Sequence, residues 1–225
     1  MTEHNLEQKV RTWSGLLEPY SRHPGPGKLV KSALLVVDMQ RFFLDKSSHA
    51  FVPSASACLG NIKAIAEKFR QAGLPVYFTR HFHRPGDMPG SMAKWWRHLL
   101  QENDPLSLLD PRIEIKPYDL VLHKRTYSAF DRTGLSTLLE ERGTEKLVIT
   151  GVMTHLCVDT TAREAFVRNL IPVVVMDATA APDEDLHISA LKTLAHGVAR
   201  LCSASQVLHS LSHENQEEDT WRDEP

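Results

Sequence analysis

Short apolar runs rich in β-branched residues alternate with helix-period segments along most of this chain, and that alternation limits the fold more than any other feature. The apolar runs occupy residues 32–38, 75–79, 119–124, 146–151, 171–177 and 199–204. Runs of this length and composition are typical of strands buried on both faces of a parallel sheet. Strands that alternate with helices predict an α/β domain with an open parallel sheet, helices on both sides and right-handed crossovers.

Helical spacing of apolar residues marks the segments between these runs. Such segments cover residues 59–69, 133–142, 155–168 and a stretch that begins near 182. Gly73 and Gly143 follow the first two segments and are suitable helix terminators. In the third segment, the spacing predicts that Val158, Ala162, Ala165 and Phe166 face the core.

The 225 residues are enough for one large domain with a sizeable core. We divide the chain into an N-terminal arm (1–31), a main domain (32–211) and an acidic, loose C-terminal tail (212–225). The net charge of −2 gives no indication of a nucleic-acid or membrane-surface partner. No apolar run approaches the roughly 20 residues that span a bilayer.

Cysteine usage and the first residues predict a cellular compartment. Three widely spaced cysteines, Cys58, Cys157 and Cys202, favour free thiols in a reducing environment over a disulfide framework or a zinc site. The opening stretch, MTEHNLEQKVRTW, contains acidic side chains and lacks the apolar segment of a secretory signal. We therefore expect a cytoplasmic protein.

Reactive side chains follow several of the predicted strands. Asp38 ends the first run, Lys124 ends the third, and Cys157 follows the fourth within about the first turn of a helix. The second run leads into a basic segment, 80–83. Because ligands bind at the carboxyl ends of the strands in open α/β sheets, we expect these groups to meet at one edge of the sheet.

Cys157 is either a small packed residue or a nucleophile. The positive end of the helix and a nearby Lys124 would favour a thiolate, and a carboxylate such as Asp38 at the end of an apolar strand needs a reason to be buried. Singly, Asp38 could cap a turn and Lys124 could lie on the surface. A base beside a thiol, oriented by a cation, is nevertheless the general design of an activated nucleophile.

Three segments, LLVVDMQRFF, HKRTYSAF and GVMTHLCVDTTAREAF, resemble the motif regions of the isochorismatase-like hydrolases. This superfamily includes nicotinamidases, N-carbamoylsarcosine amidase, ureidoacrylate amidohydrolases and isochorismatases. The resemblance covers residues 32–208, with the motifs in the same order and at similar spacing. It implies a three-layer α/β/α, Rossmann-like fold with six mainly parallel strands, a homo-oligomer (dimer or tetramer), and a catalytic triad of Asp38, Lys124 and Cys157.

The resemblance also implies a mechanism. Asp38 accepts the thiol proton, the sulfur of Cys157 attacks the substrate, and the same carboxyl group protonates the leaving amine before water hydrolyses the thioester. In the family, the peptide bond four residues before the cysteine is usually cis, and by match this is the bond between Val152 and Met153. Its implied role is to direct the N–H of Met153, together with that of Cys157, at a developing oxyanion.

The implied activity is cleavage of a C–N bond in a small amide, ureido or carbamoyl compound. The alternative is an isochorismatase-type vinyl ether hydrolase that releases pyruvate, because KRTYSAF followed by TGLSTLL resembles that branch. The siderophore and phenazine enzymes of that branch lack the cysteine, so Cys157 favours amide chemistry. A dinucleotide- or flavin-binding module would need a Gly-rich loop after the first strand, and VVDMQRFFLD has no glycine.

Substrate contacts are expected from residues near the strand ends and from the loops 45–54 and 82–105, where we place specificity. The residues that we expect to contact a small-molecule substrate are Phe43, Arg80, His81, Trp95, Trp96, Tyr127, Phe130 and His155. Arg80 could instead tie a loop down. Trp95 and Trp96 could instead form a contact between subunits or cover the core.

Nicotinamidases carry an Asp-x-His metal cluster after the second strand, and His81 and His83 occupy the matching positions here. Two histidines at i and i+2 share one face of a strand and could hold a metal with a third ligand, for which His98 is a loose candidate. Otherwise they line the pocket. We expect no metal and no cofactor.

Overall fold

The computed structural model describes residues 2, 5–88, 90–96 and 98–212. It contains one six-stranded sheet in the order β3-β2-β1-β4-β5-β6, and every neighbouring pair is parallel. The strands are β1 (Ser32–Val37), β2 (Val76–His81), β3 (Leu120–Lys124), β4 (Lys146–Val152), β5 (Ile171–Ala180) and β6 (Arg200–Cys202). The α/β architecture with six strands, predicted from the alternation of apolar runs, is confirmed.

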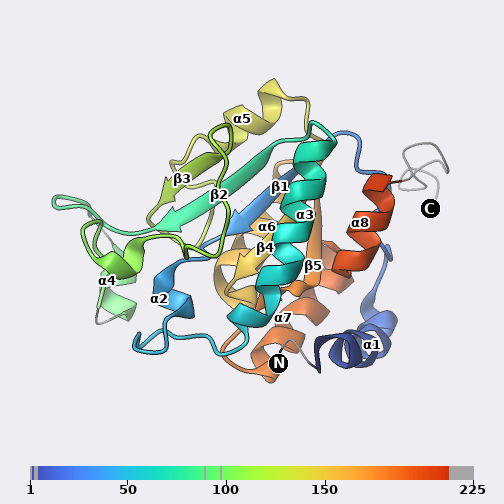
Figure 1. The fold of residues 1–225 in the computed structure, drawn as a ribbon, viewed down its shortest axis with the longest axis horizontal. Coiled ribbons are helices and arrows are strands. Elements are labelled where there is room, and N and C mark those ends of the chain that lie inside the picture. Colours follow the sequence, from blue (N-terminus) through green and yellow to red (C-terminus); the bar gives the residue numbers. More distant parts are fainter. Residues whose placement is uncertain (1, 3–4, 89, 97, 213–225) are drawn as a thin grey trace.

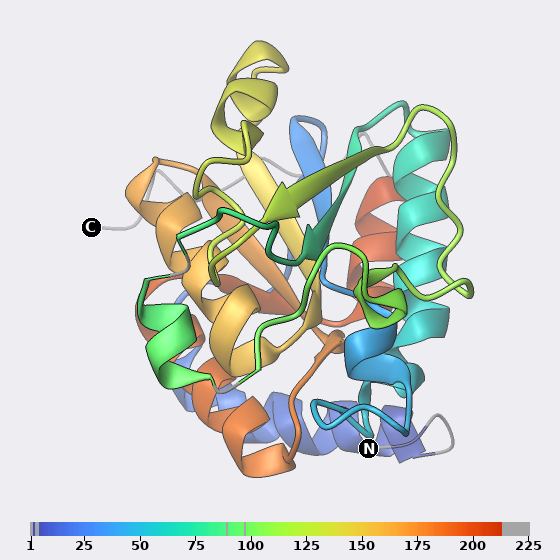
Figure 2. The same ribbon diagram turned by 90° about the vertical axis from the view of Figure 1, so that its left-hand side faces the viewer.

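Helices cover both faces of the sheet (Figure 1). They are α1 (Leu6–Leu17), α2 (Arg41–Leu44), α3 (Leu59–Gln71), α4 (Ser91–Trp95), α5 (Leu135–Glu141), α6 (Asp159–Val167), α7 (Glu184–Gly197) and α8 (Ala204–Ser212). Figure 2 shows α3 and α8 on one side of the sheet, with α6, α7 and α1 on the other. No helix within the described ranges is long and apolar enough to cross a membrane.

Strand β1 shows why the central strands read as continuous apolar runs. All six of its residues are buried, and alternate side chains face opposite layers. Leu34 and Val36 belong to the core shared with α3 and α8, whereas Leu35 and Val37 belong to the core shared with α6 and α7. Each face of the sheet thus has its own hydrophobic core.

Two parts of the helical layers differ from the sequence analysis. The N-terminal arm contains helix α1, whose Trp13 and Leu17 are buried against the α6–α7 layer. Phe166, expected to face the core, is 43% exposed, so that prediction was wrong. The other three residues predicted to face the core from this helical segment, Val158, Ala162 and Ala165, are fully buried. All but the first residue of the predicted tail lies outside the described residues.

The strand order creates a topological switch point. The chain runs from β1 outward through β2 to β3 and then returns to the opposite side of β1 with β4. At such a point the connections leave the sheet in opposite directions, and their loops part at the carboxyl ends of the central strands. The segments after β1, β3 and β4 therefore meet at this edge.

Candidate active site

Asp38, Lys124 and Cys157 come together at the carboxyl edge of the sheet. The Nζ atom of Lys124 lies 2.8 Å from Oδ2 of Asp38 and 3.2 Å from Sγ of Cys157. The same ammonium group donates a hydrogen bond to the carbonyl of Thr126. The side chains of Asp38 and Lys124 are completely buried, where an ionised pair persists only if its members are paired and hydrogen-bonded.

Thr79 on β2 fixes the position of the Asp38 carboxylate. The backbone N–H of Asp38 donates to the Thr79 hydroxyl oxygen at 3.0 Å, and this hydroxyl donates to Oδ1 of Asp38 at 2.7 Å. Asp38 has a φ of 48°, in the left-handed region that non-glycine residues avoid. Thr79 was not among the site residues predicted from the sequence. A hydroxyl at a fully buried strand position was the signal that could have revealed it.

Cys157 lies in a single wide helical turn that follows β4. The Val152–Met153 peptide bond is cis, and the π-helical turn η5 (Thr154–Val158) begins directly after it. The amide of Val158 donates to the Met153 carbonyl at 3.2 Å, which closes the wide turn. The sequence predicts a helix from about residue 155, but α6 starts only at Asp159. Single π turns often occur at functional sites.

Burial dominates the electrostatics of the cysteine. It raises the pKa of the Cys157 thiol to about 12, although the adjacent Lys124 ammonium acts in the opposite direction and Asp38 adds to the rise. Burial alone would lower the pKa of Lys124, but the Asp38 carboxylate and the Cys157 sulfur raise it above its ordinary value. Burial thus opposes the thiolate that the helix end and Lys124 were expected to favour.

His81 and His83 lie at the end of β2 and just beyond it, with ring centroids 5.3 Å apart. Both side chains are buried, and burial lowers the pKa of each below the ordinary histidine value. Among the described residues, no group of three potential ligands is arranged to hold a metal ion, and His98 lies beside His49 instead. His81 replaces the aspartate of the nicotinamidase cluster, and the described residues offer no third donor beside the two imidazoles, so they do not fit that cluster.

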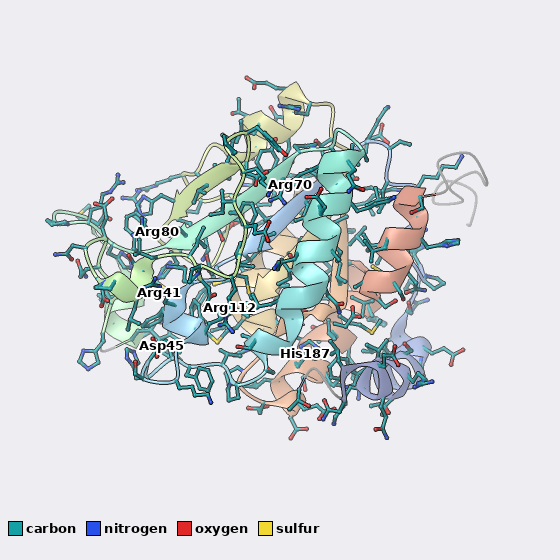
Figure 3. All side chains as sticks on the ribbon, viewed as in Figure 1. Arg41, Asp45, Arg70, Arg80, Arg112 and His187 are labelled. Atoms are coloured by element: carbon teal, nitrogen blue, oxygen red, sulfur yellow. The ribbon has the colours of Figure 1, made fainter. Side chains whose placement is uncertain are left out.

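Arg80 holds the loop that follows β2. Its Nε donates to the carbonyl of Ser107 at 2.8 Å, and its Nη2 donates to the carbonyl of Glu102 at 3.0 Å. Its guanidinium also stacks over the Phe82 ring at 4.5 Å. Figure 3 shows Arg80 where β2 ends. Of the two roles considered for Arg80, the structure shows that its side chain holds the loop in place. Contact with a substrate carboxylate stays a prediction.

The two adjacent tryptophans occupy different settings. Trp95 is 78% exposed at the end of α4, whereas Trp96 donates from Nε1 to the Tyr127 hydroxyl at 2.7 Å. This bond joins the insertion between β2 and β3 to the segment that follows Lys124. Trp96 and Tyr127 are thus in contact with each other, whereas Trp95 is turned to solvent. Contact of any of the three with a substrate stays a prediction.

The remaining predicted contact residues have different surroundings. Phe43 on α2 and Phe130 are buried, and the Arg168 guanidinium stacks over the Phe130 ring at 4.8 Å. His155 lies within η5 and is half-buried, which lowers its pKa. Their contact with a substrate stays a prediction.

Comparisons with known proteins place this geometry in a family. The model of the isochorismatase domain matches residues 32–206. Nicotinamidase 3 from Arabidopsis thaliana is 35% identical over 183 residues, which cover 80% of this chain and 88% of that protein.

Two solved structures have the same fold. A cysteine hydrolase from Pseudomonas syringae pv. phaseolicola 1448A superposes with a TM-score of 0.81 at 24% identity, covering 88% of this chain and 99% of the other. N-carbamoylsarcosine amidase from Thermoplasma acidophilum has a TM-score of 0.67 at 31% identity, covering 77% of this chain and 96% of the other. With its matching domain model, its similar relatives and its all-parallel sheet, this chain belongs to the isochorismatase family of hydrolases.

Proposed function

We propose that this protein is a cysteine hydrolase that cleaves a C–N bond of a small amide, ureido or carbamoyl compound through a thioester on Cys157. The observation that carries the proposal is the buried cluster in which Nζ of Lys124 lies 2.8 Å from Oδ2 of Asp38 and 3.2 Å from Sγ of Cys157. The names of two similar proteins, a nicotinamidase and an N-carbamoylsarcosine amidase, support amide chemistry.

The proposed reaction begins from the neutral thiol. Because burial raises the pKa of Cys157, the thiol needs a base within reach when the substrate binds, and Asp38 interacts directly with it. Asp38 takes the proton as sulfur bonds to the carbonyl carbon. The fixed positive charge of Lys124, 3.2 Å from the sulfur, stabilises the developing thiolate.

Collapse of the tetrahedral intermediate breaks the C–N bond. In our proposal, the oxyanion rests on the backbone N–H groups of Met153 and Cys157. The protonated Asp38 gives its proton to the departing nitrogen, which leaves as ammonia or an amine. Asp38 then accepts a proton from water, the hydroxide adds to the thioester, and the C–S bond breaks with the proton returning to sulfur.

The test is a panel of small primary amides, ureido acids and carbamoyl compounds, assayed for ammonia release. Replacement of the nucleophile by Cys157→Ala should lower kcat/KM for the best substrate more than about 1,000-fold, whereas Cys58→Ala, a buried cysteine outside the site, should retain activity. Isochorismate is assayed in parallel for pyruvate. Equal pyruvate release by wild type and Cys157→Ala, with no amide hydrolysed, would refute the proposal in favour of vinyl ether hydrolysis.

A further inference from the structure

The hydroxyl of Thr154 connects the nucleophile turn to a different layer of the molecule. Thr154 follows Met153 directly, begins η5 and is fully buried. Its Oγ1 lies 2.8 Å from Nδ1 of His187, a residue of helix α7. The bonds from the Leu156 and Val158 amides to the Met153 carbonyl define the internal shape of the turn. The bond to His187 instead ties the turn to α7.

His187 is itself held from behind by the N-terminal helix. Its buried ring packs against Trp13 of α1, with ring centroids 4.8 Å apart. Trp13 in turn donates from Nε1 to Glu184, at the start of α7, and Glu184 pairs with Lys9 of α1. Figure 3 shows His187 on α7, close to α1. The imidazole, which belongs to α7, is thus held between Trp13 of α1 and the hydroxyl of Thr154.

This imidazole is neutral near physiological pH. Burial lowers the pKa of His187 to about 4, so the ring has one N–H donor and one acceptor nitrogen. A neutral ring forms one short hydrogen bond with Thr154 and adds no charge beside the nucleophile. This geometry is that of a residue that supports the turn. A histidine that transferred protons would instead lie against the reacting atoms.

We propose that His187 is a positioning residue, which holds the Thr154 hydroxyl and thereby sets where the Met153 and Cys157 amides lie relative to the Lys124 ammonium. The inference rests on the proposed cysteine chemistry. Catalytic groups must be held within a fraction of an ångström, and a displacement of about 1 Å can cost roughly 100-fold in rate. A histidine that only fills the core would contribute to stability and leave turnover unchanged.

Four variants separate these two roles. Thr154→Val and His187→Leu both remove the bond, and each should lower kcat by about 10- to 100-fold with KM changed less than about threefold. Thr154→Ser and His187→Asn keep a hydrogen-bonding atom at the same place and should retain kcat within about threefold. The double variant Thr154→Val/His187→Leu should be no slower than the slower single variant, because both changes break the same bond.

The matched control is Ser32→Ala. Ser32 is also buried and its hydroxyl also bonds to protein, but it lies at the opposite end of β1 from Asp38. It should lower stability without altering kcat. Loss of stability without loss of kcat in Thr154→Val and His187→Leu, or additive effects in the double variant, would overturn the proposal.

A second readout needs no substrate, so it stands apart from the proposed function. The rate at which iodoacetamide alkylates Cys157 should rise at least about threefold in Thr154→Val and His187→Leu, because a loosened turn exposes the sulfur. It should return to the wild-type rate in His187→Asn. If the protein hydrolyses no amide but shows these changes in alkylation rate, the proposed function is contradicted and the positioning role of His187 is supported. Wild-type alkylation rates in all variants contradict the positioning role.

Discussion

The three cysteines show how one neighbouring charge distinguishes chemically identical side chains. All three thiols are buried, and burial raises the pKa of each. At Cys157 the opposing charge is the Lys124 ammonium, 3.2 Å from the sulfur. Cys58 instead bonds to the carbonyl of Thr179 at 3.4 Å and lies near the Asp177 carboxylate, which disfavours its thiolate. Cys157 is therefore the most acidic of three weakly acidic thiols.

This difference predicts the pH dependence of alkylation. With a thiol pKa of about 12, the thiolate fraction of Cys157 grows about tenfold for each pH unit between pH 7 and 10, because the pH stays below the pKa throughout. The iodoacetamide rate at Cys157 should follow this slope and exceed the rates at Cys58 and Cys202 by about tenfold or more. Peptide mass spectrometry measures all three in one sample, and the two slower cysteines are internal controls. A rate that levels off near pH 7 would mean that the resting site holds a thiolate.

Which residues could be predicted from the sequence depends on how local their signals are. Asp38, Lys124 and Cys157 each stand at the end of a recognisable strand, so a rule about strand ends places them on one edge. Thr79 and His187 act through partners 41 and 33 residues away, and those contacts depend on strand register and helix packing. Nothing in the spacing of apolar residues encodes them. The raised pKa of Cys157 likewise depends on depth of burial, which the position near a helix start did not reveal.

At the scale of elements, strands β1 and β4 approach each other so closely that one position admits only glycine. Gly151 pairs with Val37 and has a φ of 102°. A Cβ atom built on Gly151 would lie 2.0 Å from the Val37 carbonyl oxygen, which is backbone and cannot rotate away. The close approach lies one residue before Asp38 and two before Met153, so it fixes the spacing between the base and the nucleophile turn.

We therefore expect Gly151→Ala to destabilise the protein by about 3 kcal/mol or more, since both the backbone conformation and the contact are lost. Gly143→Ala is the matched control, because Gly143 also has a positive φ, of 58°, but has open space around it. It should cost only about 1–2 kcal/mol, the usual penalty of the left-handed region for a side chain. Urea unfolding gives both values from shifts of the midpoint at constant slope. Equal losses in the two variants would show that the contact with Val37 contributes nothing.

The elements themselves were predicted unequally. All six strands and helices α3, α5 and α7 follow directly from apolar runs and helical spacing. Helix α1 was missed although Leu6, Val10, Trp13 and Leu17 recur at helical spacing, because the polar and Pro-rich setting of the arm obscured the pattern. The π turn η5 has no such signal, since one turn is too short to show a period.

For the molecule as a whole, burial of several histidines links stability to pH. His81, His83, His155 and His187 come from β2, the loop after it, η5 and α7, and the pKa of each is lowered chiefly by burial. In the unfolded chain these side chains return to the ordinary value of 6.5. Between that value and the folded pKa, the unfolded state binds more protons than the folded state, so acid favours unfolding.

His187 allows this linkage to be measured for one residue. Above about pH 6.5 its ring is neutral in both states and contributes no pH dependence. As the pH falls from 6.5 towards its folded pKa of about 4, stability is lost, by about 2 kcal/mol at pH 5 and about 3 kcal/mol once both states are protonated. His187→Asn removes the titrating group and leaves every carboxylate and the other histidines in place. In urea unfolding at pH 7 and pH 5, the wild type should therefore lose about 2 kcal/mol more than His187→Asn on acidification. An equal loss in the two proteins would show that His187 titrates normally in the fold, and the acid sensitivity would then belong to the other buried histidines.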